Sequence, residues 1–86
     1  MKPIIIDVRE PLEYKLGHVK GAINIPPAKL VAGAKELADI AKDTPLLLYC
    51  MSGSRSNVSI NILSQMGFTN LTNGINRRQV EAKYGL

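Results

Sequence analysis

The chain has 86 residues, of which 45% are hydrophobic and 21% charged, the composition of one small globular domain. The aromatic share of 5% is too low for the stacking platforms that bind single-stranded nucleic acid, and no apolar run is long enough to span a bilayer. We therefore expect a single domain over residues 1–86 with no nucleic-acid or membrane partner. No export signal follows Met1, so we expect a cytoplasmic protein, or a periplasmic one if a leader has been removed.

The net charge of +4 is concentrated in the second half of the chain. Residues 1–43 contain seven Lys or Arg and six Asp or Glu, whereas residues 44–86 contain four and one. A local excess of positive charge favours small anions. A solvated basic face that aids solubility explains the same pattern equally well.

Four short segments predict strands: residues 3–8, 22–25, 46–49 and 68–72. The first is rich in β-branched residues and shows no polar alternation, which indicates a central strand buried on both faces of a parallel sheet. Pro26 and Pro27 end the second strand, because proline donates no hydrogen bond to a sheet. The dipeptide Asn73-Gly74, after the fourth strand, is typical of a turn.

Four helices are predicted between and after these strands. The first carries Leu12, Tyr14 and Leu16 and ends at Gly17, and the second has apolar residues at helical spacing from Leu30 to Ala41. The third runs from Ser54 to Met66 and is followed by Gly67, which is typical of a helix end. The last runs from Ile75 to Tyr84, with Val80 and Tyr84 inward. Strands that alternate with helices imply right-handed crossovers. We expect an α/β fold in which helices cover both faces of a mostly parallel sheet.

The segment between the third strand and the third helix combines a thiol with anion-binding features. It reads Cys50, Met51, Ser52, Gly53, Ser54, Arg55 and Ser56. Backbone N–H groups of such a loop converge on one point, and the helix dipole adds partial positive charge there. Gly53 allows a positive φ, the serine hydroxyls can cap the helix or bind anion oxygens, and Arg55 adds a full charge.

Cys50 is the only cysteine in the sequence, so it is a buried small hydrophobe, an intermolecular disulfide partner or a reactive thiol. A helix N-terminus and a nearby cation lower the pKa of a cysteine thiol from about 8.5 into the range of roughly 3.5 to 7.5. The loop offers both, which favours the reactive thiol.

Other polar residues near these elements favour structural roles. His18 lies between glycines without an acid partner in the sequence, so we expect its ring to bond nearby backbone. Asp7 and Arg9 are expected to bond each other, and Glu13 and Tyr14 to serve packing and the surface. One Cys and one His form no metal-ligand cluster, and the sequence contains no nucleotide-binding glycine loop, so we expect neither a metal nor a cofactor.

Two stretches of the chain resemble the signatures of rhodanese-like domains. Residues 6–14 and 17–26 are similar to the amino-terminal signature, and residues 50–56 are similar to the active-site loop. Gly67-Phe68 and Asn73-Gly74 also fall where the family pattern places them. The resemblance covers nearly the whole chain and implies the rhodanese-like three-layer fold.

The resemblance further implies a sulfurtransferase that takes a sulfane sulfur from a small anionic donor such as thiosulfate and passes it to cyanide or to a thiol of a small molecule or protein. Cys50 corresponds to the nucleophile that carries the persulfide. The loop from Met51 to Arg55 corresponds to the substrate cradle, with Arg55 as the cation for the anionic donor. Residues 73–78 depart from the commoner pair of glycines followed by a tryptophan, which affects pocket shape and donor preference.

Two other functions stay open. A related phosphatase or arsenate reductase also uses Cys and Arg in one loop but generally has five residues between them, whereas Met51 to Ser54 are four. A rhodanese-like domain can also serve as a non-catalytic interaction module or a sulfur carrier that accepts sulfur from a partner protein.

Overall fold

The four strands of the computed structural model, which describes residues 2–86, run parallel in one sheet. They are β1 (Ile4–Asp7), β2 (Ile23–Asn24), β3 (Leu46–Cys50) and β4 (Leu71–Asn76), in the spatial order β2-β1-β3-β4. The first strand is therefore internal, as its unbroken apolar sequence predicted. The expected α/β fold with a parallel sheet is confirmed.

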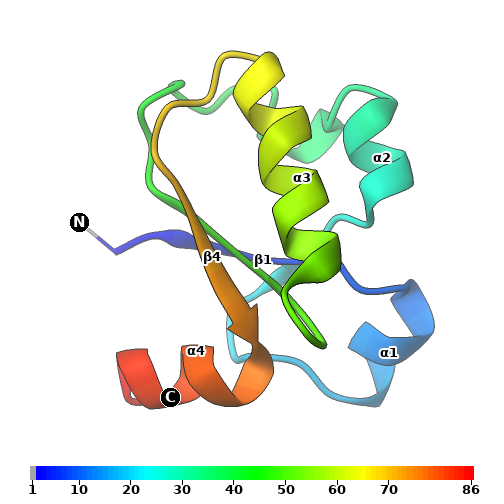
Figure 1. Cartoon of the computed structure of the whole chain (residues 1–86), viewed down its shortest axis with the longest axis vertical. Coiled ribbons are helices and arrows are strands. Elements are labelled where there is room, and N and C mark those ends of the chain that lie inside the picture. The colour runs from blue at the N-terminus through cyan, green and yellow to red at the C-terminus, as the bar shows by residue number, and fades with distance from the viewer. Residues whose placement is uncertain (1) are drawn as a thin grey trace.

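Helices lie on both faces of this sheet, which makes three layers (Figure 1). They are α1 (Pro11–Leu16), α2 (Pro27–Val31), the 3₁₀ helix η1 (Lys35–Leu37), α3 (Ser54–Gln65) and α4 (Arg77–Tyr84). Helices α2 and α3 lie together on one side of the sheet, and α4 lies on the other. Within residues 2–86, no helix combines the length and the apolar character needed to cross a membrane.

Successive residues of the central strands enter two separate cores, because side chains of a strand alternate between faces. Leu46, Leu48 and Cys50 belong to the larger core, and Leu47 and Tyr49 belong to the smaller one. All five residues of β3 are buried. A strand buried on both faces fixes its own position in the sheet, and with it the position of the loop that follows Cys50.

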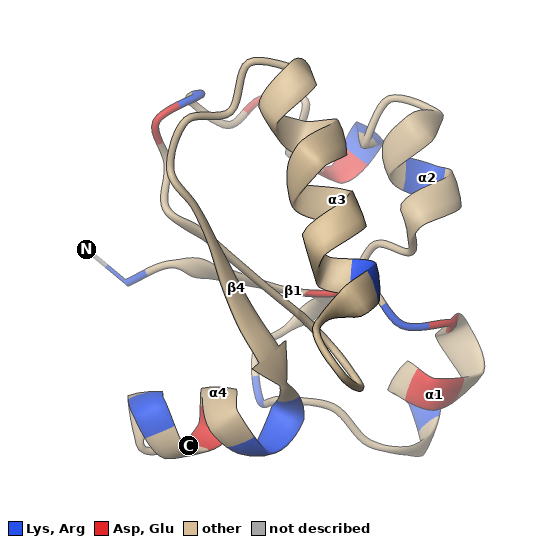
Figure 2. Ribbon diagram, viewed as in Figure 1, with Lys and Arg blue, Asp and Glu red and all other residues tan. Residues whose placement is uncertain are grey.

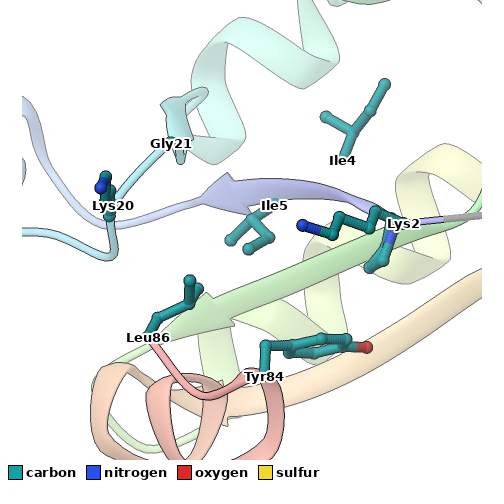
Figure 3. Close-up of a pocket in the computed structure, with 8 residues that line it drawn as sticks. Lys2, Ile4, Ile5, Lys20, Gly21, Tyr84 and Leu86 are labelled. Atoms are coloured by element: carbon teal, nitrogen blue, oxygen red, sulfur yellow. The ribbon is translucent and has the colours of Figure 1, made fainter.

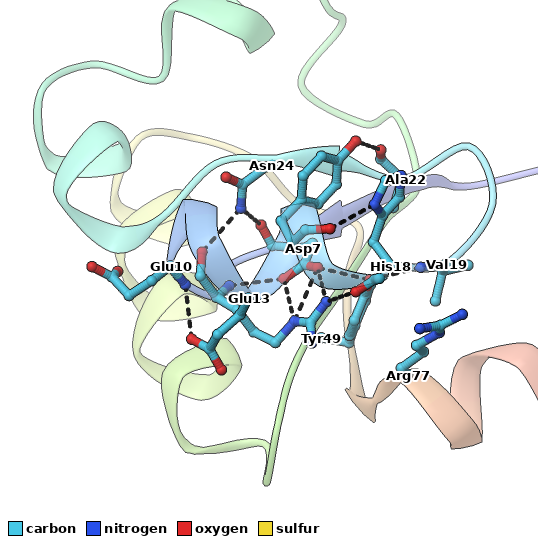
Figure 4. A network of polar contacts seen from close by, with 12 residues as sticks. Asp7, Glu10, Glu13, His18, Val19, Ala22, Asn24, Tyr49 and Arg77 are labelled. Carbon is cyan, nitrogen blue, oxygen red and sulfur yellow. Dashed lines mark hydrogen bonds and ion pairs between the residues drawn. The ribbon is translucent and has the colours of Figure 1, made fainter.

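A buried carboxylate ties the carboxyl ends of β1 and β3 together (Figure 4). Asp7 is fully buried and accepts hydrogen bonds from the Arg9 guanidinium, the shortest at 2.6 Å, and from the Tyr49 hydroxyl at 2.8 Å. Arg9 also donates to the Gly17 carbonyl oxygen at 2.6 Å, and Tyr49 accepts from the Val19 N–H at 3.0 Å. The expected bond between Asp7 and Arg9 is present, within a larger network.

The predicted second helix is wrong beyond Val31. Helix α2 ends there, and the chain then turns through Gly33 at φ 117° and Ala34 at φ 48° into η1. Two successive residues with positive φ cannot continue a right-handed helix. The sequence nevertheless shows apolar residues at helical spacing beyond Val31. The reason is that Ala34 and Leu37 are both buried in the larger core, although they do not belong to one helix.

The predicted turn at Asn73-Gly74 is also wrong, because both residues belong to β4. The pairing of β3 with β4 shifts here, since Leu48 pairs with Asn73 and Tyr49 pairs with Ile75, so that Gly74 is the extra residue of a bulge. A Cβ on Gly74 would lie 2.6 Å from Cγ2 of Val80. Close packing of β4 against α4, not a reversal of the chain, explains this glycine.

The ends of the last two elements differ from the expected ones. Strand β4 begins at Leu71, after the buried Phe68, and α4 begins at Arg77, where the Asn76 side chain accepts a hydrogen bond from the Gln79 N–H. Val80 is buried as expected. Tyr84 was expected to face inward but is 37% exposed.

We expect Tyr49→Phe to reduce the free energy of unfolding by about 1–3 kcal/mol, because it leaves the buried Val19 N–H without a partner and removes one of the hydrogen bonds to the buried Asp7 carboxylate. Urea denaturation measures this loss. Tyr84→Phe is the matched control, since it removes the hydroxyl of a partly exposed tyrosine and should change stability by less than about 0.5 kcal/mol. Equal effects would contradict a structural role for the buried hydroxyl.

Candidate active site

Cys50 is the last residue of β3, and its side chain lies at the carboxyl end of the parallel sheet. Only three residues, Met51 to Gly53, separate it from α3. Gly53 adopts the positive φ of 93° that the sequence predicted and forms the N-cap of α3. This tight connection directs the start of a twelve-residue helix at the sulfur, where its dipole favours negative charge.

Backbone N–H groups act directly on the thiol. The Gly53 N–H donates to Cys50 Sγ at 3.0 Å. Burial raises the pKa of Cys50, but hydrogen bonds from the Ser56 hydroxyl and from the N–H groups of Ser56, Ser52 and Gly53 outweigh it and lower that pKa from 9.0 to about 7. The thiolate is therefore well populated at neutral pH, although the residue is only 2% exposed.

Ser56 lies on the first turn of α3 and is fully buried. Its Oγ has no hydrogen bond of ordinary geometry to another described residue, yet its hydroxyl favours the Cys50 thiolate. A buried hydroxyl without a partner costs free energy. This side chain therefore has a hydrogen bond to give to a negatively charged sulfur or to an atom attached to it.

Arg55 forms an ion pair with Glu13 of α1. Its Nη1 lies 2.6 Å from Glu13 Oε1 and its Nη2 lies 3.1 Å from Glu13 Oε2, which is a bidentate arrangement. The hydrogen bond from Arg55 is the main reason that the pKa of Glu13 falls to about 2, and the carboxylate in turn raises the pKa of Arg55. In Figure 2 the first turn of α3 carries a basic residue and α1 carries an acidic one. Glu13 is thus part of the site and not merely a surface residue.

The bulge in β4 supports the loop from the other side. Asn73 donates from Nδ2 to the Gly53 carbonyl oxygen at 3.1 Å, and its Oδ1 accepts from the Ile75 N–H at 2.9 Å. Ile75 has a φ of 74°, a strained conformation for a β-branched residue. Strain of this kind concentrates at functional sites, and here one amide side chain links the strained bulge to the loop around Cys50.

The side chains of the other residues in the expected substrate cradle, Met51, Ser52 and Ser54, are exposed. The Met51 side chain is 66% exposed. The hydroxyls of Ser52 and Ser54 lie 3.2 Å from each other and are exposed, so Ser52 acts on Cys50 through its backbone N–H. The loop and the first turn of α3 therefore stabilise the thiolate through the Ser56 hydroxyl and through backbone N–H groups.

His18 has the structural environment that the sequence predicted. Its Nδ1 lies 2.8 Å from the Tyr14 carbonyl oxygen, and its ring stacks on that of Tyr14 with centroids 3.7 Å apart. Tyr14 also donates from its hydroxyl to the Ala22 carbonyl oxygen at 2.7 Å. These contacts hold the connection between α1 and β2. Within residues 2–86, no three His, Cys, Asp or Glu side chains gather as metal ligands would.

A surface pocket of about 390 Å³ lies away from Cys50, beside the amino end of β1 (Figure 3). Its lining includes Lys2, Ile5, Tyr84 and Leu86. Because all strands run parallel, the pocket lies at the amino ends of the strands and the thiol lies at their carboxyl ends. The lining of the pocket includes no residue of the loop around Cys50.

Comparison with known proteins identifies the family. The profile of the Rhodanese-like domain matches residues 1–77. The chain belongs to the rhodanese-like domain family. It is 43% identical over 68 residues to the thiosulfate sulfurtransferase PspE of Escherichia coli (strain K12), a match that covers 79% of this chain and 64% of PspE.

Two further comparisons agree with this rhodanese-like assignment. The chain is 40% identical over 72 residues to the uncharacterized protein YqhL of Bacillus subtilis (strain 168), covering 84% of this chain and 55% of YqhL. It therefore spans 55% to 64% of the length of these two relatives. A solved structure described as rhodanese with anions from E. coli matches with a TM-score of 0.75 at 34% identity over 91% of each chain.

Two residues of this rhodanese-like site were not expected from the sequence. Glu13 lies 42 positions from Arg55 in the chain, and no local pattern relates residues so far apart. Asn73 was predicted to belong to a turn, and its hydrogen bond to the Gly53 carbonyl depends on the bulge in β4, which no local pattern indicates.

We expect the rate of Cys50 alkylation by neutral iodoacetamide to rise with pH around a midpoint of about 7, because the thiolate is the reacting form. Ser56→Ala removes a hydrogen bond to the thiolate and should raise this midpoint by roughly 0.5–1 unit. Ser59→Ala is the matched control, because Ser59 is equally buried on α3 but donates to the Arg55 carbonyl oxygen. Identical midpoints in both variants would contradict a role for Ser56.

Proposed function

We propose that this rhodanese-like domain is a sulfurtransferase that carries a sulfane sulfur as a persulfide on Cys50. The observation that carries the proposal is the thiol itself, which is nearly buried beneath the N-terminus of α3 and has its pKa lowered to about 7 by converging hydrogen bonds. A buried core cysteine would have no such donors. The relative PspE, named a thiosulfate sulfurtransferase, supports thiosulfate as the donor.

The reaction divides into two displacements. In the first, Cys50 Sγ attacks the sulfane sulfur of thiosulfate, a new S–S bond forms, and the old S–S bond breaks with its electron pair leaving on sulfite. In the second, a thiolate or cyanide attacks the outer sulfur of the persulfide and regenerates the Cys50 thiolate. Covalent catalysis of this kind replaces one difficult transfer by two easier ones.

The donors around Cys50 suit both states of this cycle. The thiolate and the persulfide each carry one negative charge, and preorganised N–H groups stabilise such charge without reorganising. The Gly53 N–H already lies at 3.0 Å from Sγ. The Ser56 hydroxyl, which has no other partner among the described residues, supplies a further donor for the negatively charged sulfur.

A sulfur carrier loaded by a partner protein uses the same Cys50 chemistry and differs only in its donor. The exposed Met51 side chain, at 66%, provides an apolar contact beside the thiol for such a partner. The phosphatase alternative ranks lower, because the four residues between Cys50 and Arg55 form a small loop and Arg55 is held by Glu13.

We expect thiosulfate to add one sulfur atom to the protein, and a reducing thiol to remove it, as measured by intact mass. Cys50→Ser should accept no sulfur, because an alcohol at this position forms no persulfide. Addition to both proteins, or to neither with thiosulfate and other sulfane donors, would contradict the proposal. Loading from a partner protein alone would identify a carrier.

We expect Arg55→Ala to reduce kcat/KM for thiosulfate by about 10- to 100-fold, the range for losing a hydrogen bond to a charged group. Alkylation by neutral iodoacetamide should fall much less. Arg77→Ala is the control, since Arg77 pairs with Glu81 on α4. If both measurements fell equally in Arg55→Ala, Arg55 would act on thiolate formation and not on donor binding.

A further inference from the structure

The cation expected to bind the sulfur donor is neutralised by a carboxylate of the same chain. Both oxygens of Glu13 contact Arg55, at 2.6 Å and 3.1 Å. Glu13 Oε1 also accepts the Glu10 N–H at 3.0 Å, so the carboxylate is held in place at the first turn of α1. Because the pKa of Glu13 is about 2, it stays ionised at every pH at which Cys50 is a thiolate.

Two other arginines of the described chain also pair with carboxylates. Arg9 is bound to the buried Asp7 at 2.6 Å, and Arg77 is bound to Glu81 at 2.9 Å. Of the four basic residues in 44–86, Arg55 and Arg77 are thus paired with carboxylates. The partial charges of the loop N–H groups and of the α3 dipole add to the attraction for an anion.

A dianionic donor meets an unfavourable charge balance at this site. The pair of Glu13 and Arg55 has no net charge, and the Cys50 thiolate contributes one negative charge. Arg55 is 36% exposed, so a donor can reach it, but the donor must share the guanidinium with Glu13. This competition weakens the binding of an anion in proportion to the charge of that anion.

We infer that Glu13 is a specificity-determining residue that restrains Arg55 and so lowers the preference of the site for dianionic sulfur donors over less charged ones. The inference rests on the proposed sulfurtransferase function and concerns the donor step of that function. It assigns Glu13 no contact with the reacting sulfur. The ligand class favoured by the native pair is a sulfane sulfur donor with one negative charge or none.

Two donors that share one chemistry but differ in charge test this inference. Thiosulfate is a dianion, and methanethiosulfonate, CH₃SO₂S⁻, is a monoanion. Each gives its sulfane sulfur to the Cys50 thiolate, and the electron pair of the broken S–S bond leaves on sulfite or on methanesulfinate respectively. The ratio of the two kcat/KM values cancels changes in thiolate reactivity that affect both donors.

Glu13→Gln is the informative variant, because glutamine keeps an oxygen for the Glu10 N–H and removes the charge. We expect it to raise kcat/KM for thiosulfate relative to methanethiosulfonate by about three- to tenfold, mainly by lowering KM for thiosulfate. A change of this size corresponds to the energy of one partly exposed ion pair. Glu10→Gln makes the same change of net charge, but Glu10 has no hydrogen bond to Arg55 and makes the smallest contribution to its raised pKa, so this variant should move the ratio by less than about twofold.

An independent measurement separates this inference from the proposed function. The ratio of Cys50 alkylation rates with iodoacetate, an anion, and iodoacetamide, a neutral analogue, reports the charge at the thiol without any sulfur transfer. We expect Glu13→Gln to raise this ratio about threefold and Glu10→Gln to leave it nearly unchanged. If the protein transferred no sulfur but this ratio rose, the proposed function would fail while the control of site charge by Glu13 would stand.

Three results would overturn the inference. The first is that Glu13→Gln changes neither the ratio of the two donors nor the ratio of the two alkylation rates. The second is that Glu10→Gln changes these ratios as much as Glu13→Gln does, which would mean that net charge alone causes the effect. The third is a loss of thiosulfate use in Glu13→Gln, which would mean that Glu13 orients Arg55 toward the donor and does not restrain it. A thermal melt of each variant confirms that the compared proteins are folded.

Discussion

The buried carboxylate of Asp7 is the constraint on which the geometry of the active edge depends. A charge removed from water is tolerated only with full compensation by partners, and Asp7 obtains it from the Arg9 guanidinium and the Tyr49 hydroxyl. Arg9 extends the network to the carbonyl of Gly17, at the end of α1. One carboxylate therefore determines where β1, β3 and α1 meet, and this places Glu13 within reach of Arg55.

The second constraint is the short connection from β3 to α3. Only Gly53, with its positive φ, allows the chain to leave a fully buried strand and enter a helix within three residues. The bulge of β4 braces this connection, because Asn73 bonds the Gly53 carbonyl while Ile75 stays in a strained conformation. Strain in β4 and the order of the loop around Cys50 are thus coupled through one side chain.

The sequence was sufficient for the parts of the fold that depend on local patterns. The apolar run of β3, the helix that follows Gly53 and the helix-ending Gly67 each show their conformation within a few residues. The prediction of the second helix was wrong because the chain reaches the buried Ala34 through a left-handed turn, and apolar spacing in the sequence does not reveal such a turn. The predicted turn at Asn73-Gly74 was wrong because a glycine is needed at position 74 for the close approach of Val80. That approach is a tertiary contact, which the turn-like dipeptide does not indicate.

The site shows the same division, because the thiol and its loop are local in sequence, whereas the partner of Arg55 is not. This division also separates two tasks at Cys50. The groups that most lower its pKa are the Ser56 hydroxyl and the N–H groups of Ser56, Ser52 and Gly53, which are all neutral and held by the α3 turn. Arg55 is therefore not needed as the main source of thiolate stability, and its charge can be balanced by Glu13 without loss of the nucleophile. Under the proposed function, a site built this way keeps its reactivity constant while the ion pair between α1 and α3 adjusts which donor it accepts.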